Sequence, residues 1–178
     1  MCGPARPEKG PRSQSRGSEC PCVTRATMVA MDVPRPRFEQ FDATVADGLV
    51  GMPDPTDGLP GFLGIRHVEA DPGLLRAEIP MRDDLATPFG NLHGGVLAAL
   101  CDHVLGMVCY PVIPRGSWAA TIEFKLNYLA PVTTGALDAT AAIVSLTKRT
   151  AVVHVDVVNE ARLVCTAQGT VQIMAPRA

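Results

Sequence analysis

The chain has 178 residues, 47% of them hydrophobic and 19% charged, and a formal net charge of −2. This length predicts one domain with a complete hydrophobic core, and the composition is that of a globular chain rather than a disordered one. The near-neutral charge argues against nucleic acid as a partner. Charged residues interrupt the apolar runs before the ~18 residues that a membrane span needs, and no secretory signal is recognisable, so we expect no membrane partner.

Residues 1–33 are rich in Pro, Gly, Ser and Arg and follow neither a helical nor a strand period. They predict a disordered N-terminal tail, followed by one domain over residues 34–178. The cysteines lack the dense, regular spacing of a disulfide framework. We therefore expect a reduced, cytoplasmic protein.

The first element predicted after the tail is an amphipathic helix that begins at Arg37 and ends before Gly51. Its apolar residues recur at helical spacing, at Phe38, Phe41, Val45 and Leu49. A loop over residues 51–61 follows. The next residues predict a pair of strands, Phe62–Glu69 and Leu74–Pro80, that turn at residues 71–73.

Residues 81–93 read as a loop that leads into a long apolar helix from Gly94 to Tyr110. Four predicted strands complete the chain: Trp118–Ala130, Ala136–Leu146, Ala151–Asn159 and Leu163–Met174. Their short joints favour an antiparallel meander. A helix that is apolar nearly all round must be wrapped, so the sequence predicts an α+β domain in which a curved antiparallel sheet of about six strands surrounds one long central helix.

One carboxylate, Asp102, lies about two turns into this apolar helix, where a buried charge is costly unless it has a use. The residues three and four positions away are mostly small, which leaves room for a ligand or for a second helix: Ala98, Ala99, Leu105 and Gly106. Both explanations stay open on this pattern alone. At the helix start, the glycine pair Gly94-Gly95 would present unpaired N–H groups that can stabilise an oxyanion.

The spacing of these groups adds a constraint. Gly94 and Asp102 are ~12 Å apart along a helix, whereas a reacting carbonyl lies ~3 Å from both its oxyanion donor and its attacking group. One helix cannot supply both groups to one substrate, but two antiparallel copies can. If the site is catalytic, we expect it at a two-fold dimer interface, with two sites in each dimer.

The His93-Gly94-Gly95 run, Asp102 nine residues after the histidine, and the segment Ile122–Pro131 together resemble the hotdog-fold acyl-CoA thioesterases. The branch most similar is the PaaI-like one of phenylacetate degradation, which includes thioesterase superfamily member 2, and the likeness runs from about Phe62 to Met174. It implies a hotdog fold and hydrolysis of aryl or fatty acyl thioesters to free acid and thiol. It also implies no cofactor or metal, an acyl-CoA or related acyl-thioester substrate, and a homodimer or dimer of dimers.

The resemblance further assigns roles to residues. The Gly94 N–H would polarise the thioester carbonyl, and Asp102 of the partner subunit would act on water as a general base or attack as a nucleophile. His93 would help to shape the site, and Thr121 would orient the water or the aspartate. Strict strand alternation, however, predicts that Thr121 lies on the polar side of its strand, with Ile122 on the opposite side.

Five more residues are expected to contact the substrate: Thr87, Asn91, Gly95, Lys148 and Arg149. Lys148 and Arg149 lie in a predicted turn where related proteins often carry basic residues near the CoA phosphates. At Thr87, six residues before the histidine, many relatives have Asn or Gln, and a threonine hydroxyl is shorter and makes fewer hydrogen bonds.

Two other functions remain as alternatives. The threonine at position 87 raises the possibility of a non-catalytic acyl-thioester binding protein. A hotdog hydratase or dehydratase acting on enoyl or hydroxyacyl thioesters needs a paired histidine and acid. The spacing fits it poorly, because His103 points ~100° away from Asp102 on a helix.

Overall fold

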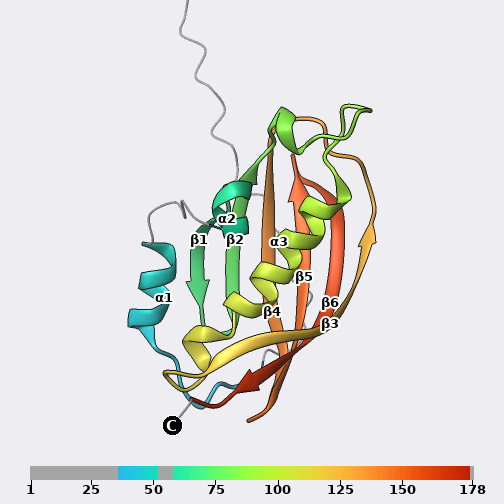
Figure 1. The fold of residues 1–178 in the computed structure, drawn as a ribbon. Helices are drawn as coiled ribbons and strands as arrows, with labels where there is room; N and C mark the ends of the chain where they lie inside the picture. The colour runs from blue at the N-terminus through green and yellow to red at the C-terminus, as the bar shows by residue number, and fades with distance from the viewer. Residues whose placement is uncertain (1–35, 52–57, 177–178) are drawn as a thin grey trace, which may run out of the picture. The chain divides into compact units, whose positions relative to one another are not determined.

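The computed structural model describes residues 36–51 and 58–176. The predicted tail, residues 1–33, lies outside this range. In the described chain, six strands form one antiparallel sheet in the order β1-β2-β4-β5-β6-β3, and the sheet curls around α3 (Figure 1). The helices are α1 (Ala43–Val50), α2 (Gly58–Leu63), η1 (Asp83–Leu85), α3 (Gly94–Met107) and η2 (Tyr110–Val112). The strands are β1 (Arg66–Asp71), β2 (Leu74–Pro80), β3 (Trp118–Tyr128), β4 (Ala136–Leu146), β5 (Thr150–Asn159) and β6 (Arg162–Met174).

The core lies between α3 and the concave face of the sheet. Six residues of α3 are buried: Val96, Leu97, Leu100, Cys101, Val104 and Leu105. They meet sheet residues that point inward at every second position, as along β5, where Ala151, Val153, Val155 and Val157 are fully buried. Each such aliphatic side chain larger than alanine contributes about 1.5–3 kcal/mol of burial free energy. The predicted α+β architecture, with a wrapped central helix, is confirmed.

The order of the strands differs from the predicted meander. Strands β4, β5 and β6 do form one, but β3 pairs with β6 at the far edge of the sheet and not with β4. The cause is α3, which crosses the concave face after β2, so that the chain enters the sheet again at the opposite edge. Residues 129–135 then return across the end of the sheet, where Val132 is buried and its carbonyl accepts the Leu92 N–H at 2.7 Å.

Several element boundaries also differ from the predictions. The long helix ends at Met107 and not at Tyr110, and α2 begins at Gly58, inside the predicted loop 51–61. The first helix begins at Ala43 and not at Arg37, because the carboxylate of Asp42 accepts the N–H groups of Thr44 and Val45 as an N-cap. Residue Phe62 belongs to α2 rather than to a strand, and β1 begins only at Arg66.

A β-bulge changes which way the first part of β3 faces. The register with β6 shifts between Thr121 and Glu123, so that Thr121 lies opposite Val171, a fully buried core residue. Residues directly opposite each other share a face of the sheet, so Thr121 faces α3. The prediction of a polar face was therefore wrong, since strict alternation does not allow for the extra residue of a bulge.

The stretch Gly94–Val112, which includes α3, is long and apolar enough to cross a membrane by length and composition. More than half of it is buried inside the protein, as Figure 1 shows by the sheet that curls around it. A core helix of a globular domain has the same two properties, which explains why this stretch passes the test.

Candidate active site

The first turn of α3 leaves one backbone donor unused. His93 is the N-cap, and its Nδ1 accepts the N–H of Gly95 at 2.9 Å, while its carbonyl accepts the N–H of Val96 at 2.9 Å. The N–H of Gly94 has no intrahelical acceptor at this position, and none is found elsewhere in the described residues. It therefore remains available for an external acceptor, with the positive end of the helix dipole behind it.

His93 has a defined tautomer in this arrangement. Because Nδ1 accepts a hydrogen bond, the proton of the neutral ring is on Nε2. The side chain lines a cleft beside the start of α3.

The loop before α3 is held by the pair Thr87 and Asn91. The Thr87 hydroxyl donates to Asn91 Oδ1 at 3.0 Å, and the Thr87 N–H donates to the Asn91 carbonyl at 2.7 Å. The amide of Asn91 donates to the Leu92 carbonyl at 3.2 Å. Both side chains are thus engaged with each other and with the loop backbone, and together they fix the approach of the chain to His93.

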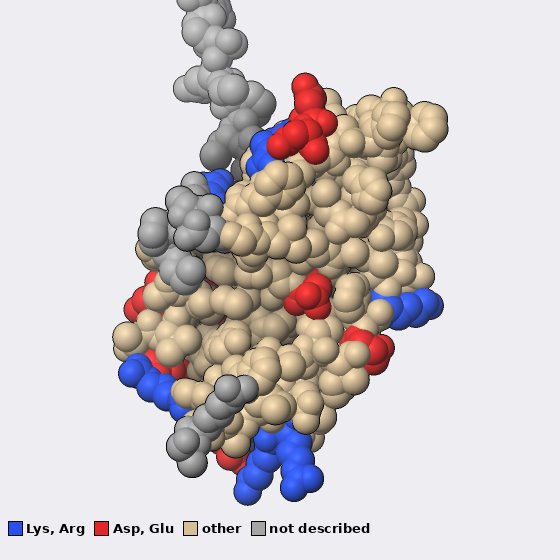
Figure 2. All heavy atoms as spheres, in the orientation of Figure 1, with Lys and Arg blue, Asp and Glu red and all other residues tan. Residues whose placement is uncertain are grey.

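Asp102 lies on the exposed face of α3. Within the described residues, no hydrogen bond or ion pair to its carboxylate is found. Figure 2 shows the side of the protein on which α3 lies as a mostly uncharged surface with an isolated acidic group over the helix, and Asp102 is the one charged residue of α3 apart from any protonated histidine. The small residues predicted beside Asp102, namely Ala98, Ala99 and Gly106, are partly exposed. Leu105, the larger residue of that predicted group, is fully buried and belongs to the core.

His103, the next residue, points to β1 instead. Its Nε2 lies 3.0 Å from Nε2 of His67, with the two rings nearly parallel. One of the two rings donates this hydrogen bond through its Nε2–H and the other accepts it. Burial lowers the pKa of His103 to about 4, and the neighbouring His67 acts in the same direction while Asp102 opposes it. Burial lowers the pKa of His67 as well.

An apolar cleft of about 360 Å³ opens beside the start of α3. Its apolar lining comes from α2, from the loop around η1 and from α3, with Leu59, Phe62, Leu63, Leu85, Val96 and Ala99. Arg82 holds α2 in place, because it donates to the Phe62 carbonyl at 2.7 Å and its guanidinium lies 5.8 Å from the centre of the Phe62 ring. Asp84 binds the same guanidinium at 3.0 Å and also lines the cleft.

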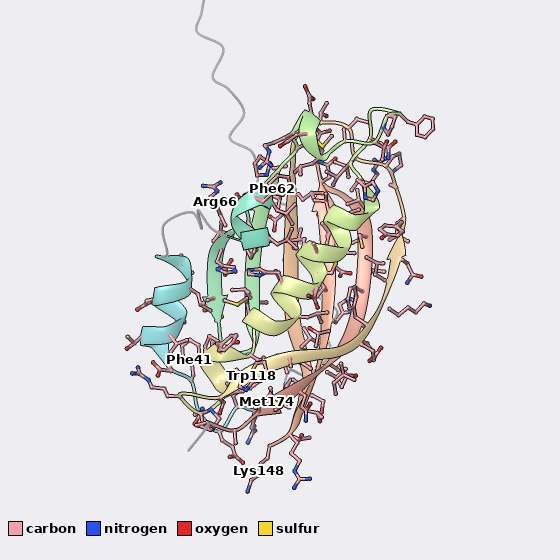
Figure 3. All side chains as sticks on the ribbon, in the orientation of Figure 1. Phe41, Phe62, Arg66, Trp118, Lys148 and Met174 are labelled. Atoms are coloured by element: carbon pink, nitrogen blue, oxygen red, sulfur yellow. The ribbon has the colours of Figure 1, made fainter. Side chains whose placement is uncertain are left out.

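The remaining candidate residues lie apart from this cluster in one protomer. Lys148 and Arg149 are exposed in the turn between β4 and β5. Figure 3 shows Lys148 at the opposite end of the protein from Phe62, which lines the same cleft as His93. A single protomer therefore brings together the loop, the capping histidine and the glycine pair, but not the basic turn.

Sequence reasoning missed two contacts of the site. The hydroxyl of Tyr128 donates to the carbonyl of Gly94 at 3.0 Å, and Phe62 forms a wall of the cleft. Tyr128 stood in the recognised motif but was interpreted only as one residue of an alternating strand. Neither contact has a local sequence signal, because each joins residues far apart in the chain.

The fold and these groups define an α+β protein with a helix N-terminus that offers a free amide beside an apolar cleft. The sequence profile of the thioesterase superfamily matches residues 89–166. A protein of Halobacterium salinarum that is named as an esterase is 32% identical to this chain over 126 residues. The matched region covers 68% of this chain and 83% of that protein. The 1,4-dihydroxy-2-naphthoyl-CoA hydrolase of Listeria monocytogenes is 27% identical over 121 residues, or 67% of this chain and 98% of that one.

A solved structure gives the same result for the fold. The phenylacetic acid degradation-related protein of Ralstonia eutropha superposes with a TM-score of 0.65 at 26% identity, over 72% of this chain and 98% of that one. The chain belongs to the thioesterase superfamily. It has the hotdog thioesterase fold and is a thioester hydrolase, as the resemblance implied.

The buried histidine pair predicts a loss of stability in mild acid. The pKa of His103 is about 4 in the folded protein and 6.5 when unperturbed, so the unfolded chain binds the proton more tightly. This contribution to stability is complete above pH ~6.5 and is lost as the pH falls toward the folded value. We expect the free energy of unfolding to fall by about 2 kcal/mol between pH 7 and pH 5.

Chemical denaturation of the wild type and of His103→Gln at both pH values tests this prediction. The variant should be less sensitive to pH, because the titrating group on α3 is gone. An equal change in both proteins would contradict it.

Proposed function

We propose that the chain hydrolyses acyl-CoA thioesters in a site that two subunits form together. The observation that carries this proposal is the pair of unused groups on α3, namely the Gly94 N–H without an acceptor and the exposed Asp102 carboxylate without a hydrogen bond or ion pair. An amide donor for the oxyanion and a carboxylate that acts as base or nucleophile are the groups that hydrolysis of a thioester uses.

The Gly94 N–H is the proposed oxyanion donor. The thioester carbonyl would accept this N–H, and the negative charge that develops on its oxygen during attack would be stabilised by the fixed donor and by the helix dipole. We propose the Nε2–H of His93, the residue that precedes Gly94, as a further donor to the substrate. The N–H of Gly95 already donates to Nδ1 of His93. We therefore propose that Gly95 leaves space for the substrate and donates no hydrogen bond to it.

Asp102 of the partner subunit is the proposed base or nucleophile. As a base, it would take a proton from water while the water oxygen bonds to the carbonyl carbon; the carbon–sulfur bond then breaks, and the thiolate leaves with a proton. As a nucleophile, its carboxylate oxygen would bond to the carbonyl carbon while the carbon–sulfur bond breaks and the thiolate leaves; water would then hydrolyse the resulting mixed anhydride to the free acid and the carboxylate of Asp102. Thr121 faces α3, so its hydroxyl is on the correct side of the sheet to orient the water or the carboxylate.

The free edge of β3 supports a dimer. Among the described strands β3 is an edge strand of 11 residues, and Trp118, Ile122 and Tyr128 along it are 42%, 58% and 55% exposed. A long edge strand with unpaired backbone groups and exposed apolar side chains can pair with a second copy of the chain. Pairing of two β3 strands about a two-fold axis would place the two α3 helices antiparallel, with Gly94 of one near Asp102 of the other.

The same symmetry would bring the basic turn to the site. Lys148 lies at the far end of its own protomer from the cleft, which is the end that a two-fold axis turns toward the partner's cleft. Lys148 and Arg149 are exposed there and suit the phosphates of CoA. Free thiols at Cys101, Cys109 and Cys165 are compatible with the reducing cytoplasm, which we keep as the proposed location.

The cleft beside α3 is the proposed acyl pocket. Its volume of about 360 Å³ and its apolar walls suit an aromatic ring or a medium-length alkyl chain. The described lining of the cleft contains the acidic residue Asp84 and no lysine or arginine. Asp84 is already paired with Arg82, so a second carboxylate on the acyl group would meet no free cation in this lining. We therefore propose uncharged acyl groups as substrates.

Replacement of the carboxylate tests the function. Asp102→Asn should lower kcat for thiol release from acyl-CoA by at least about 100-fold, because the proton acceptor or nucleophile is lost. Asp47→Asn, an exposed residue of α1, is the matched control and should keep wild-type turnover.

Thiol release and crotonyl-CoA hydration, measured over a panel of acyl-CoAs, separate the three possible functions. Release of thiol supports hydrolysis. Binding without any release supports the acyl-thioester binding protein, and hydration of crotonyl-CoA supports the hydratase. An Asp102→Asn variant with near wild-type turnover would contradict the proposal.

Shortening the wall of the cleft tests the acyl pocket. Phe62→Ala should lower kcat/KM for phenylacetyl-CoA and octanoyl-CoA by about tenfold, and for acetyl-CoA by less than about twofold, because only the larger groups reach the ring. Phe41→Ala, near α1, is the control for loss of an aromatic ring elsewhere. An equal loss for all three substrates would contradict a role in acyl recognition.

A further inference from the structure

The side chain of Tyr128 lies directly against the first residue of α3. Its hydroxyl donates to the Gly94 carbonyl at 3.0 Å. A Cβ atom built on Gly94 would lie 3.0 Å from Cζ of the tyrosine ring and 3.2 Å from its oxygen, which is tighter than ordinary contacts. The tyrosine ring therefore packs closely against Gly94, and a Cβ at this position would require the ring to shift by a few tenths of an ångström.

The contact completes the hydrogen bonds of the first helical turn. The Gly94 carbonyl and the Gly95 N–H belong to one planar peptide unit. Tyr128 holds its carbonyl end, and Nδ1 of His93 accepts its N–H end at 2.9 Å. The carbonyl of His93 is bound by the N–H of Val96 at 2.9 Å. The Gly94 N–H is the polar backbone group of this turn that stays without a partner in the described residues.

Such a restraint matters because two consecutive glycines begin the helix. Glycine has more backbone freedom than any other residue, so the direction of an N–H in a Gly-Gly pair is poorly fixed by the chain itself. A donor that stabilises a developing oxyanion must be oriented before the reaction. The tyrosine supplies an anchor from a different element, since β3 holds Tyr128 opposite Cys165 of β6.

We propose that Tyr128 is a positioning residue that fixes the Gly94 N–H in the direction required for oxyanion stabilisation. This inference rests on the proposed function of that amide. Tyr128 binds the Gly94–Gly95 peptide and so restrains the φ and ψ angles of Gly94, which set the direction of the preceding His93–Gly94 peptide that carries the N–H. It exchanges no proton with the substrate. Its ring is 55% exposed in the protomer, and a hydrogen bond from so exposed a group adds little to the stability of the fold.

The test removes only the hydroxyl. Tyr128→Phe keeps the ring against Gly94, and we expect kcat for thiol release to fall about tenfold while KM changes by less than about twofold. The melting temperature should be unchanged, and amide exchange of the Gly95 N–H should become faster. The chain has one other tyrosine, Tyr110 at the start of η2 beyond the opposite end of α3, and Tyr110→Phe is the matched control with wild-type kcat.

The possible outcomes separate this inference from the proposed function. A wild type that releases thiol and a Tyr128→Phe variant with the same kcat would overturn the positioning role and leave the function intact. A change in KM alone would also overturn it, since it would indicate a substrate contact. A fall in kcat that parallels a fall in melting temperature would indicate a merely structural role. A wild type without thioesterase activity would overturn both proposals.

Discussion

The fixed rise of α3 is the constraint on which the proposed site depends. The helix places the Gly94 N–H and the Asp102 carboxylate ~12 Å apart, and its packed side chains prevent it from bending to bring them together. A single protomer leaves both groups without a partner among the described residues, and it leaves β3 as a long edge strand that carries exposed apolar side chains. The pairing of two copies along β3 would cover this edge. It would also bring the Gly94 N–H of one subunit close to the Asp102 carboxylate of the other.

The chemistry of the helix start follows from a small set of residues. A histidine in the N-cap position uses its ring to bind the second amide of the turn, and so the first amide remains available. A side chain at position 94 would lie in tight contact with the Tyr128 ring, which would have to shift by a few tenths of an ångström to make room for a Cβ. The apolar cleft begins at the same turn, so the group that would polarise a carbonyl and the walls that would hold an acyl group lie side by side.

Much of the fold could be predicted because it depends on local periodicity. The bounds of β2 and β4 and the start of α3 agree with the predicted ones, since each is set by alternating or helical burial and by turn residues next to it. The position of β3 at the far edge could not be predicted, because it depends on the path of α3 over the sheet. The bulge at Thr121 was missed for a similar reason, as it is defined only by the register with β6.

The candidate site was predictable in part. The His-Gly-Gly run and Asp102 are close in sequence and share one helix, so their relation follows from helical geometry. The contacts that complete the environment of the helix join distant residues. Tyr128 touches Gly94 from β3, and His67 of β1 pairs with His103. No spacing within either segment indicates these contacts, and only the folded chain reveals them.

The central claim is that each site takes its amide and its carboxylate from different subunits, and mixing two inactive variants tests it most directly. Gly94→Pro removes the donor at a position where proline is tolerated, since Gly94 is the first helical residue and His93 already has an extended backbone. Gly94→Ala is its control, because it adds a Cβ but keeps the N–H. Unfolding and refolding Gly94→Pro together with Asp102→Asn should restore up to about a quarter of wild-type thiol release, because half of the dimers are mixed and each contains one intact site. No recovery in dimers shown to be mixed would contradict the account.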